Sequence, residues 1–326
     1  MKKCLANLTL ITSLFFLTGF HDLTDGRSVL NLEETVSVND INRAIREKAG
    51  QKGGPKTYYF GFDLRIGPSE DARQYLPFLD FLSRATGLGF ELRFTSKASS
   101  IIDDLGTGRV DFAAIGAVSF IEANIQYGAR ILARGVNQRG KAEYRSMIVV
   151  SPDSAIKTLN DLRGKSFAFG SVSSTQGHLI PRITLSQNGI ELSDLAVYGY
   201  TGSHRDCANS VIKGTFSACG MQDTMAESLE EEGALKILHV SPYYPSSGIA
   251  ANQNVPTAVI EKVRQALVDF APLGRDKENL YDWHKTEMPN GFQIARPIDY
   301  DELQAWLNTF GLAPEHSNIG TETPSQ

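Results

Sequence analysis

Short apolar segments typical of strands alternate with amphipathic segments typical of helices from about residue 57 to residue 240, and this alternation constrains the fold most strongly. Strands are predicted at 58–62, 90–94, 110–115, 130–133, 147–150, 166–169, near 197, at 216–219 and at 235–240. Helices are predicted at 73–86, 99–105, 119–127, 159–162, 174–188, 205–213 and 224–232, and the C-terminal part is predicted to be helical at 256–270, around 280–283 and at 300–310. Strands that alternate with helices are typical of α/β folds with largely parallel sheets.

Length, charge and motifs exclude several classes of function. A chain of 326 residues is long enough for two domains of ordinary size. The net charge of -5 argues against a nucleic-acid surface, because such surfaces carry a basic excess. No Gly-x-Ser-x-Gly, His-Glu-x-x-His or Walker motif occurs in the sequence. The missing motifs argue against an enzyme. We expect neither a metal nor a cofactor.

The N-terminal residues 1–20 have the pattern of a signal peptide. Lys2 and Lys3 precede an apolar stretch at 5–20 that is short for a membrane-spanning helix. An uncleaved anchor and a buried helix are the alternatives. Phe20 stands where a bacterial lipobox has its lipidated cysteine, so the sequence does not support a lipid anchor. We expect export to the periplasm.

Residues 21–56 form a polar extension that ends in Gly-Gly-Pro at 53–55, a composition typical of a linker. In an exported chain, the oxidising compartment permits a disulfide between Cys207 and Cys219. Both cysteines are predicted at the same end of a helix and of the strand that follows it. Two buried free thiols remain the simpler expectation, and the spacing of the cysteines fits no metal motif.

The segment 173–177 follows a predicted strand and opens a predicted helix. The first backbone N–H groups of a helix have no partner within the helix, and the helix dipole adds positive potential at this end. Such a terminus binds anions. Ser174 and Thr175 add hydroxyl groups there, and Gly177 allows the backbone to approach a ligand closely. Ordinary helix capping by serine and threonine is the alternative interpretation of the same residues.

Several segments in order resemble one family of binding proteins. The segment 173–182, Ser-Ser-Thr-Gln-Gly-His-Leu-Ile-Pro-Arg, is similar to the Ser-Thr-Ser-Gly-x-x-x-Pro segment of the phosphate/phosphite/phosphonate-binding proteins of ABC transporters. The other segments that carry the resemblance are 108–116, 119–120, 151–171, 202–204 and 241–248. The likeness covers about residues 58–270 and identifies the chain as resembling type II periplasmic binding proteins.

This resemblance implies an α/β type II periplasmic-binding-protein fold, in which two mixed sheets flanked by helices are joined by two hinge crossovers. Lobe 1 is expected to contain residues 57–146 and 242–326, and lobe 2 residues 147–241. The crossovers are expected near 147–150 and 239–241. The implied function is capture of a small oxyanion of the phosphonate or phosphate type between the lobes, for delivery to an ABC permease. We expect a monomer.

The resemblance also implies which residues bind the ligand. The helix start contributes Ser173, Ser174, Thr175, Gln176 and Gly177.

Outside this segment the implied ligand-binding residues are His204, Asp223, Ser119, Phe120 and Tyr243. His204 matches a histidine that contacts the phosphorus-bearing group, and Asp223 matches an acidic residue that helps to select ligand substituents. Capping or core packing would also explain His204, and capping of the next helix would also explain Asp223.

The chain departs from the family pattern at three of its positions. Gln176 replaces the second serine of Ser-Thr-Ser, and Ser217 stands where relatives have an aspartate. Phe120 occupies the position of a tyrosine and has no hydroxyl group. Tyr243 or Tyr244 could supply a phenol instead, and packing at the crossover is the alternative role of these two residues. These departures indicate a different oxyanion, or a larger ligand that carries one.

Two other classes of function remain open from the sequence. A sensor of the same fold would report its ligand to a membrane signalling protein, and the extension at 21–56 leaves room for that role. An enzyme on this scaffold would use His178, His204 and Asp223 as acid–base groups, but no activated nucleophile accompanies them.

Overall fold

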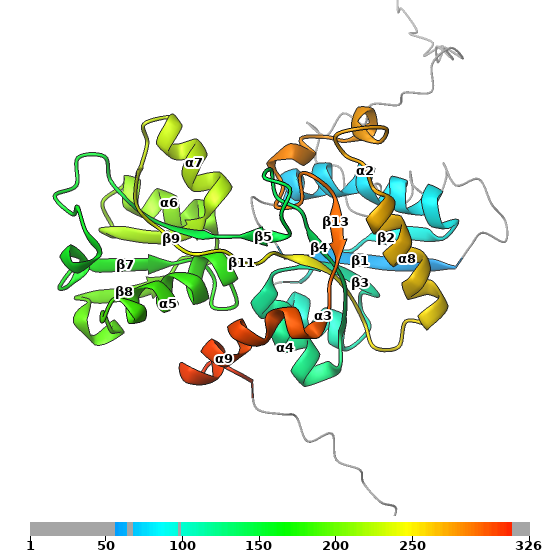
Figure 1. Cartoon of the computed structure of the whole chain (residues 1–326), viewed down its shortest axis with the longest axis horizontal. Helices are drawn as coiled ribbons and strands as arrows, with labels where there is room; N and C mark the ends of the chain where they lie inside the picture. The colour runs from blue at the N-terminus through cyan, green and yellow to red at the C-terminus, as the bar shows by residue number, and fades with distance from the viewer. Residues whose placement is uncertain (1–55, 64–67, 97–98, 315–326) are drawn as a thin grey trace, which may run out of the picture. The chain divides into compact units, whose positions relative to one another are not determined.

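The computed structural model describes residues 56–63, 68–96 and 99–314, and these residues form two large sheets flanked by helices, together with one two-stranded sheet (Figure 1). We call the six-stranded sheet with its helices lobe 1 and the five-stranded sheet with its helices lobe 2. The strand order is β13-β4-β12-β3-β1-β2 in lobe 1 and β10-β6-β9-β7-β8 in lobe 2.

The strands of lobe 1 are mixed in direction. β1 pairs in parallel with β2 and β3, whereas β12 pairs antiparallel with β3 and β4, and β13 pairs antiparallel with β4. These strands are β1 (Thr57–Phe62), β2 (Gly89–Leu92), β3 (Phe112–Ile115), β4 (Arg130–Gly135), β12 (Gly248–Ala251) and β13 (Phe292–Ile294).

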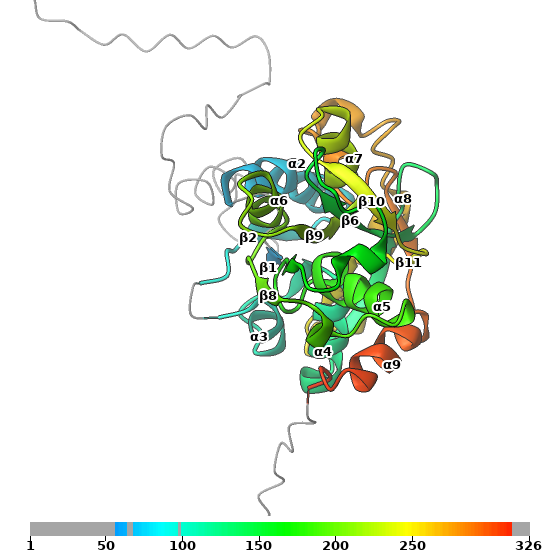
Figure 2. The same cartoon turned by 90° about the vertical axis from the view of Figure 1, so that its left-hand side faces the viewer.

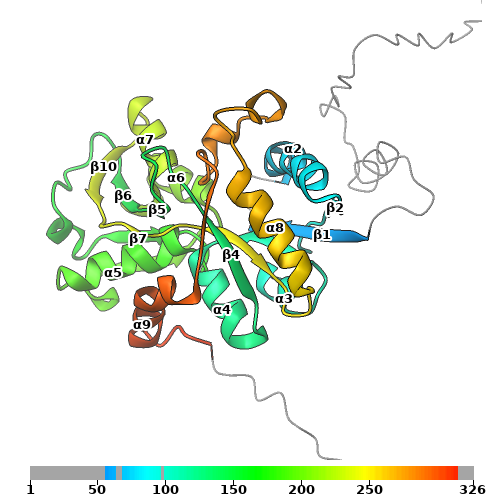
Figure 3. The ribbon, with the colours of Figure 1, turned by 45° about the vertical axis from the view of Figure 1, so that its right-hand side comes forward.

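Both faces of the lobe 1 sheet are covered by helices because side chains alternate between them along each strand. On β3, Phe112 and Ala114 pack in one core with α2 (Pro68–Thr86) and α8 (Thr257–Asp269). Ala113 and Ile115 point to the other face, which α3 (Ile101–Gly106), α4 (Ala117–Tyr127) and α9 (Asp301–Thr309) cover. Figure 3 shows α8 on the first side of this sheet and α9 next to α4 on the second.

Lobe 2 repeats this design with a smaller sheet. Its strands are β6 (Ser146–Val150), β7 (Ser166–Phe169), β8 (Val197–Tyr200), β9 (Ala218–Gln222) and β10 (Lys236–Val240). On β6, Met147 and Val149 pack against α6 (His204–Ile212) and α7 (Asp223–Glu231). Ile148 and Val150 point to the opposite core, to which α5 (Ile180–Gln187) contributes. Figure 2 faces this lobe and shows α5 on the other side of the sheet from α6 and α7.

The chain passes between the lobes twice, at β5 (Glu143–Tyr144) and β11 (Tyr244–Pro245), which pair antiparallel with each other. The crossovers were predicted near 147–150 and 239–241. The structure corrects this position, because both of those segments belong to the lobe 2 sheet as β6 and β10. The crossing strands are only two residues long, so no apolar periodicity marks them in the sequence.

Two strands that were not predicted complete the lobe 1 sheet. β12 has the sequence Gly-Ile-Ala-Ala, in which small residues are fully buried between β3 and β4. β13 is only three residues long and interrupts a part of the chain that was predicted to be helical. Their pairing is antiparallel, so the sheet is not largely parallel. α2 also begins earlier than predicted, at Pro68, whose fixed φ suits the first turn of a helix.

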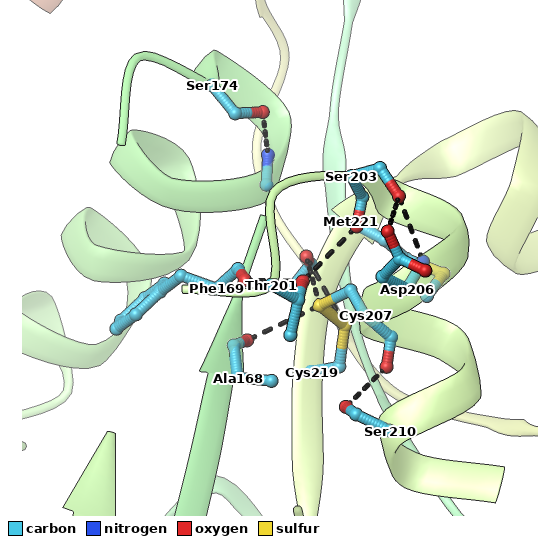
Figure 4. Close-up of a disulfide and its surroundings, with 12 residues drawn as sticks. Ala168, Phe169, Ser174, Thr201, Ser203, Asp206, Cys207, Ser210, Cys219 and Met221 are labelled. Atoms are coloured by element: carbon cyan, nitrogen blue, oxygen red, sulfur yellow. Dashed lines mark hydrogen bonds between the residues drawn. A yellow bond between two sulfur atoms is a disulfide. The ribbon is translucent and has the colours of Figure 1, made fainter. Parts of the chain in front are cut away.

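Cys207 and Cys219 form a disulfide across twelve residues, with their Cα atoms 5.9 Å apart (Figure 4). The expectation of two free thiols is therefore wrong. Both cysteines are fully buried in lobe 2, where the bond links the first turns of α6 to β9. The bond thus fixes the beginning of α6, which also contributes to the functional site.

The predicted signal peptide at 1–20 and extension at 21–56 fall almost entirely outside the described residues. Within the part of the chain that the structure describes, no helix is long and apolar enough to cross a membrane.

Candidate functional site

A pocket of about 240 Å³ lies where lobe 1 and lobe 2 face each other. The starts of three helical segments border it, namely α4 from lobe 1 and both η2 (Thr175–Leu179) and α6 from lobe 2. The lining residues are Phe62, Asp63, Thr95, Ile101, Gly116, Ser119, Tyr144, Ser171, Ser173, Ser174, Thr175, Gln176, Gly202, Ser203, His204, Ser247 and Glu287. Hydroxyl groups dominate this lining, and among the residues that the structure describes it includes neither lysine nor arginine.

The segment 174–177 forms the first turn of a continuous helix made of η2 and α5. Ser174 caps this turn, because its hydroxyl oxygen accepts a hydrogen bond from the Gly177 N–H at 2.9 Å (Figure 4). The N–H groups of Thr175 and Gln176 have no hydrogen-bond acceptor among the described residues. These two amides and the Ser174 hydroxyl proton are therefore available to an anion.

Pro181 explains why η2 has the wider π-helical turn. A proline has no N–H group, so it cannot bond the carbonyl oxygen four residues earlier. That oxygen, on Gly177, instead accepts the N–H of Gly170 at 2.8 Å, which closes the loop between β7 and η2. An added Cβ at Gly177 would lie 2.8 Å from the Ser174 hydroxyl oxygen and 3.0 Å from Cε1 of His204. Only glycine allows this close approach.

His178 stabilises the loop between β7 and η2 from the side that faces away from the pocket. Its Nδ1 lies 2.6 Å from the Val172 carbonyl oxygen, and its Nε2 lies 3.1 Å from the Tyr200 hydroxyl. Burial lowers the pKa of His178, so the ring is neutral, donates to Val172 and accepts from Tyr200. His178 therefore positions the loop and does not face the pocket, which leaves the enzyme hypothesis without one of its acid–base groups.

The first turn of α6 brings Ser203 and His204 to the pocket. Ser203 caps α6, since its hydroxyl oxygen accepts the Asp206 N–H at 3.0 Å, and its proton is donated to the Asp206 carboxylate at 2.7 Å (Figure 4). Ser203 and Ser174 thus differ in one respect. The hydroxyl proton of Ser203 is already used, whereas that of Ser174 has no acceptor among the described residues.

Lobe 1 contributes the start of α4 to the pocket, opposite the starts of η2 and α6. The Val118 N–H donates to the Thr175 hydroxyl oxygen at 2.9 Å, a direct bond between the lobes. The preceding Gly116 N–H donates to the Asp63 carboxylate at 2.9 Å. The N-terminal amides of α4 are thus shared between a residue of its own lobe and a residue of lobe 2.

Carboxyl groups surround the pocket on several sides. Asp63 and Glu287 line it, and Glu287 is only 8% exposed. Burial raises the pKa of Glu122 on α4 to about 7, and the neighbouring charge of Asp63 acts in the same direction. Burial likewise raises the pKa of Asp223 to about 6, although hydrogen bonds from Arg145 and Thr224 oppose the shift. The pocket is therefore acidic outside its helix termini.

Tyr144 on β5 places a phenol in the pocket wall. Its side chain is 3% exposed, and its hydroxyl makes no hydrogen bond of ordinary geometry although Thr175 and Ser247 lie beside it. Burial, followed by the charge of Glu287, raises the pKa of Tyr144, so the hydroxyl keeps its proton. Leaving such a buried hydroxyl without a partner costs about 1–3 kcal/mol, and a bound ligand would remove that cost.

The structure brings most of the predicted ligand residues together. Those that line the pocket are Ser119, Ser173, Ser174, Thr175, Gln176 and His204, and Gly177 lies directly behind them.

Three predicted ligand residues lie elsewhere. Phe120 is 2% exposed and packs against Tyr300 with the ring centroids 4.9 Å apart. Tyr243 bonds Arg139 at the surface. Asp223 lies behind Gln176, whose side-chain amide donates to it at 3.2 Å.

Sequence reasoning missed Asp63, Tyr144 and Glu287. Asp63 comes directly after β1, and polar residues at the end of a strand are a usable signal for a site. Tyr144 and Glu287 lie in a two-residue strand and in a loop, where no pattern singles them out. Among the described residues, no group of three or more His, Cys, Asp or Glu side chains is placed to hold a metal ion.

Comparison with known proteins agrees with this architecture. A family model described as "ABC transporter, phosphonate, periplasmic substrate-binding protein" matches residues 60–300. The phosphonates-binding periplasmic protein of Escherichia coli (strain K12) is 26% identical over 257 residues, which cover 73% of this chain and 75% of that protein. The phosphate-import protein PhnD of Mycolicibacterium smegmatis is 25% identical over 230 residues, 65% of this chain and 71% of that protein.

Among solved structures, PhnD1 from Prochlorococcus marinus in complex with methylphosphonate has a TM-score of 0.70 at 18% identity, covering 79% of this chain and all of that one. This likeness confirms the predicted type II fold. The family model spans most of the described residues and both lobes. The chain belongs to the family of periplasmic phosphonate substrate-binding proteins of ABC transporters.

Proposed function

We propose that this substrate-binding protein captures a small oxyanion of the phosphonate or phosphate type in the pocket between its lobes. The observation that carries the proposal is the convergence of the helix starts at Gly116, Ser174 and Ser203 on one pocket. Each helix start contributes about half a positive charge, and η2 also offers the N–H groups of Thr175 and Gln176. Three of them together concentrate positive potential at the pocket.

The donors suffice for useful affinity. A hydrogen bond to a charged group contributes about 1.5–3 kcal/mol net, and micromolar binding requires about 8 kcal/mol. Five donors face the pocket: the amides of Thr175 and Gln176 and the side chains of Ser174, Tyr144 and His204. At about 1.5–3 kcal/mol each, they contribute roughly 7.5–15 kcal/mol, so micromolar affinity is within reach once the entropy lost on binding is taken from the upper part of this range. The names of the relatives, which bind phosphonates, phosphate or methylphosphonate, support the same class of ligand.

The departures from the family pattern fit this proposal. Gln176 uses its side-chain amide to bond the Arg145 carbonyl oxygen at 2.9 Å and the Asp223 carboxylate, so it supports the site from the hinge side. The phenol that Phe120 lacks is supplied by Tyr144. The pocket is therefore suited to a small oxyanion and not to a large ligand.

Membership of the family makes an ABC permease the partner and the periplasm the location. We further propose that cleavage of residues 1–20 releases the protein into the periplasm without a lipid anchor, because Phe20 replaces the lipobox cysteine. We also propose that the released protein is a monomer. The mass of the mature protein and its elution volume in size-exclusion chromatography test both points. A retained N-terminus or a stable dimer would contradict them.

Isothermal titration calorimetry with phosphate, phosphite and methylphosphonate tests the ligand. Methylphosphonate or one of the other two is expected to bind at micromolar affinity and to raise the melting temperature, because it binds only the folded state. Tight binding of a nucleotide or an amino acid, with none of these three anions bound, would contradict the proposal.

A further inference from the structure

A second hollow, of about 610 Å³, lies on lobe 1 and shares no lining residue with the pocket between the lobes. It follows two helices, α2 and α8, which pack on each other over the same face of the lobe 1 sheet (Figure 3). Its lining comes from residues 81–86 of α2, from residues 262–269 of α8 and from the loop after α8. We call this hollow the α2–α8 groove.

The lining of the α2–α8 groove combines small apolar side chains with charged ones. Ala85 is exposed, while Ala266 and Phe81 are 5% and 7% exposed. The two alanines are short, so another helix can come close to the backbones of α2 and α8. Arg84 and Lys262 are exposed side chains of the same lining. A surface of this kind suits the apolar face of an amphipathic helix whose polar face stays in water.

The chain enters lobe 1 beside this groove. The Lys56 carbonyl oxygen accepts the Gly89 N–H at 3.3 Å, and Thr57 pairs with Gly89 where β1 and β2 begin. Thr86, which lines the groove, comes shortly before Gly89 in the sequence. The residues that precede Lys56 therefore leave lobe 1 next to the α2–α8 groove.

The N-terminal extension contains one segment with the pattern of an amphipathic helix. Its apolar residues Ile41, Ala44, Ile45 and Ala49 have the spacing that places them on one helix face. A helix over residues 41–49 would be about 13 Å long, and isolated helices this short are not stable in water. The segment therefore needs a surface that covers its apolar face.

The groove is within reach of this segment and has a matching length. The part of α8 from Lys262 to Asp269 extends about 10 Å along the groove. Residues 50–55 join the segment to lobe 1 and span at most about 20 Å. A tether this short holds the segment near the groove at an effective concentration on the order of 1 mM. The segment of the same chain therefore has an advantage over a second copy or another partner.

We propose that residues 41–49 dock as an amphipathic helix in the α2–α8 groove of their own chain, with Ile41 and Ile45 against Ala85 and Ala266. The family model matches residues 60–300 and does not include this segment. Docking covers the apolar part of the groove and fixes the end of the extension to lobe 1. It does not depend on the ligand, because the groove is separate from the ligand pocket.

Two alanine substitutions in the segment form a matched pair. Ile45→Ala removes an apolar side chain from the docking face, whereas Arg43→Ala changes the opposite face of the same helix. Alanine is the best helix former, so neither change weakens the helix itself. Ala85→Glu blocks the groove instead, and it replaces an exposed side chain that is not part of the lobe 1 core.

Hydrogen–deuterium exchange of the mature chain, measured by mass spectrometry, tests the proposal. The amides of residues 41–49 are expected to exchange about tenfold more slowly than in an unfolded chain. This protection is expected to persist on dilution, because docking within one chain does not depend on protein concentration. Ile45→Ala and Ala85→Glu are expected to abolish the protection, whereas Arg43→Ala is expected to keep it. Acetylation of the Lys262 amine is expected to be faster in Ile45→Ala than in Arg43→Ala, which reports on the groove itself.

Three results would contradict the proposal. Unprotected amides at 41–49 in the wild-type protein would leave the groove open to another partner, such as the permease. Equal protection in Ile45→Ala and Arg43→Ala would mean that the apolar face of the segment does not dock in the groove. Protection that is lost on dilution would assign the groove to a second copy of the chain. The comparison of Ile45→Ala with Arg43→Ala decides the question even if Ala85→Glu does not fold.

Discussion

Replacing Ser174 with alanine separates helix capping from ligand binding. Two helices begin at the pocket with a serine cap, Ser174 on η2 and Ser203 on α6, so the chain provides its own matched control. Both hydroxyl oxygens accept a backbone N–H three residues later. Only Ser203 donates its own proton to a neighbouring carboxylate, that of Asp206 at 2.7 Å.

The expected magnitudes follow from this contrast. Loss of a serine cap costs about 1 kcal/mol of stability, and we expect this cost in Ser174→Ala and in Ser203→Ala. Ser174→Ala also loses a hydrogen bond to a charged ligand, which contributes about 1.5–3 kcal/mol. This corresponds to a loss of affinity of about tenfold to a hundredfold. Ser203→Ala is expected to change affinity by less than about threefold.

Calorimetry at a temperature well below unfolding, combined with urea denaturation of each variant, measures the two effects separately. A similar loss of affinity in both variants would mean that capping alone explains the result. Unchanged affinity in Ser174→Ala would refute the role of its hydroxyl proton. Either result contradicts the reasoning.

Three further predictions concern stability and pH. Replacing both Cys207 and Cys219 with alanine is expected to cost about 3 kcal/mol, because the disulfide closes a loop of about twelve residues; an unchanged urea midpoint would contradict this. Gly177→Ala is expected to abolish high-affinity binding in calorimetry and to destabilise lobe 2 by about 1–3 kcal/mol, since its Cβ would lie 2.8 Å from the Ser174 hydroxyl. Glu122 has its folded-state pKa raised to about 7 from 4.5, so the folded protein binds the extra proton between these values and stability is lost as the pH rises through this window. Glu122→Gln is therefore expected to raise the melting temperature at pH 8 relative to the wild type and to make no such difference at pH 4, and an equal effect at both would count against it.

Much of the fold was predictable because its periodic segments are long. The alternation on β3 and β6 sends successive side chains to opposite cores, and this period is visible in the sequence. β5, β11 and β13 were not predictable, because two or three residues carry no period and are held by their partners. The crossovers were therefore placed a few residues into the neighbouring strands.

The candidate site was likewise predictable only in part. The start of η2 was predictable because Ser174, Thr175 and Gly177 are contiguous and follow a strand. The part of the pocket lining that Asp63, Tyr144 and Glu287 form was not predictable, because these residues come from distant parts of the sequence and meet only in the folded chain. The position of Phe120 outside the pocket also has a physical cause. Phe120 is apolar and one position after Ser119, so helix geometry turns it into the core.

A crystal structure of the protein with methylphosphonate tests the central claim most directly. Phosphonate oxygens are expected within hydrogen-bonding distance of the Thr175 and Gln176 amides and the Ser174 hydroxyl, between the starts of η2, α4 and α6. Ligand density at another surface, or a complex in which these amides still face only solvent, would contradict the account.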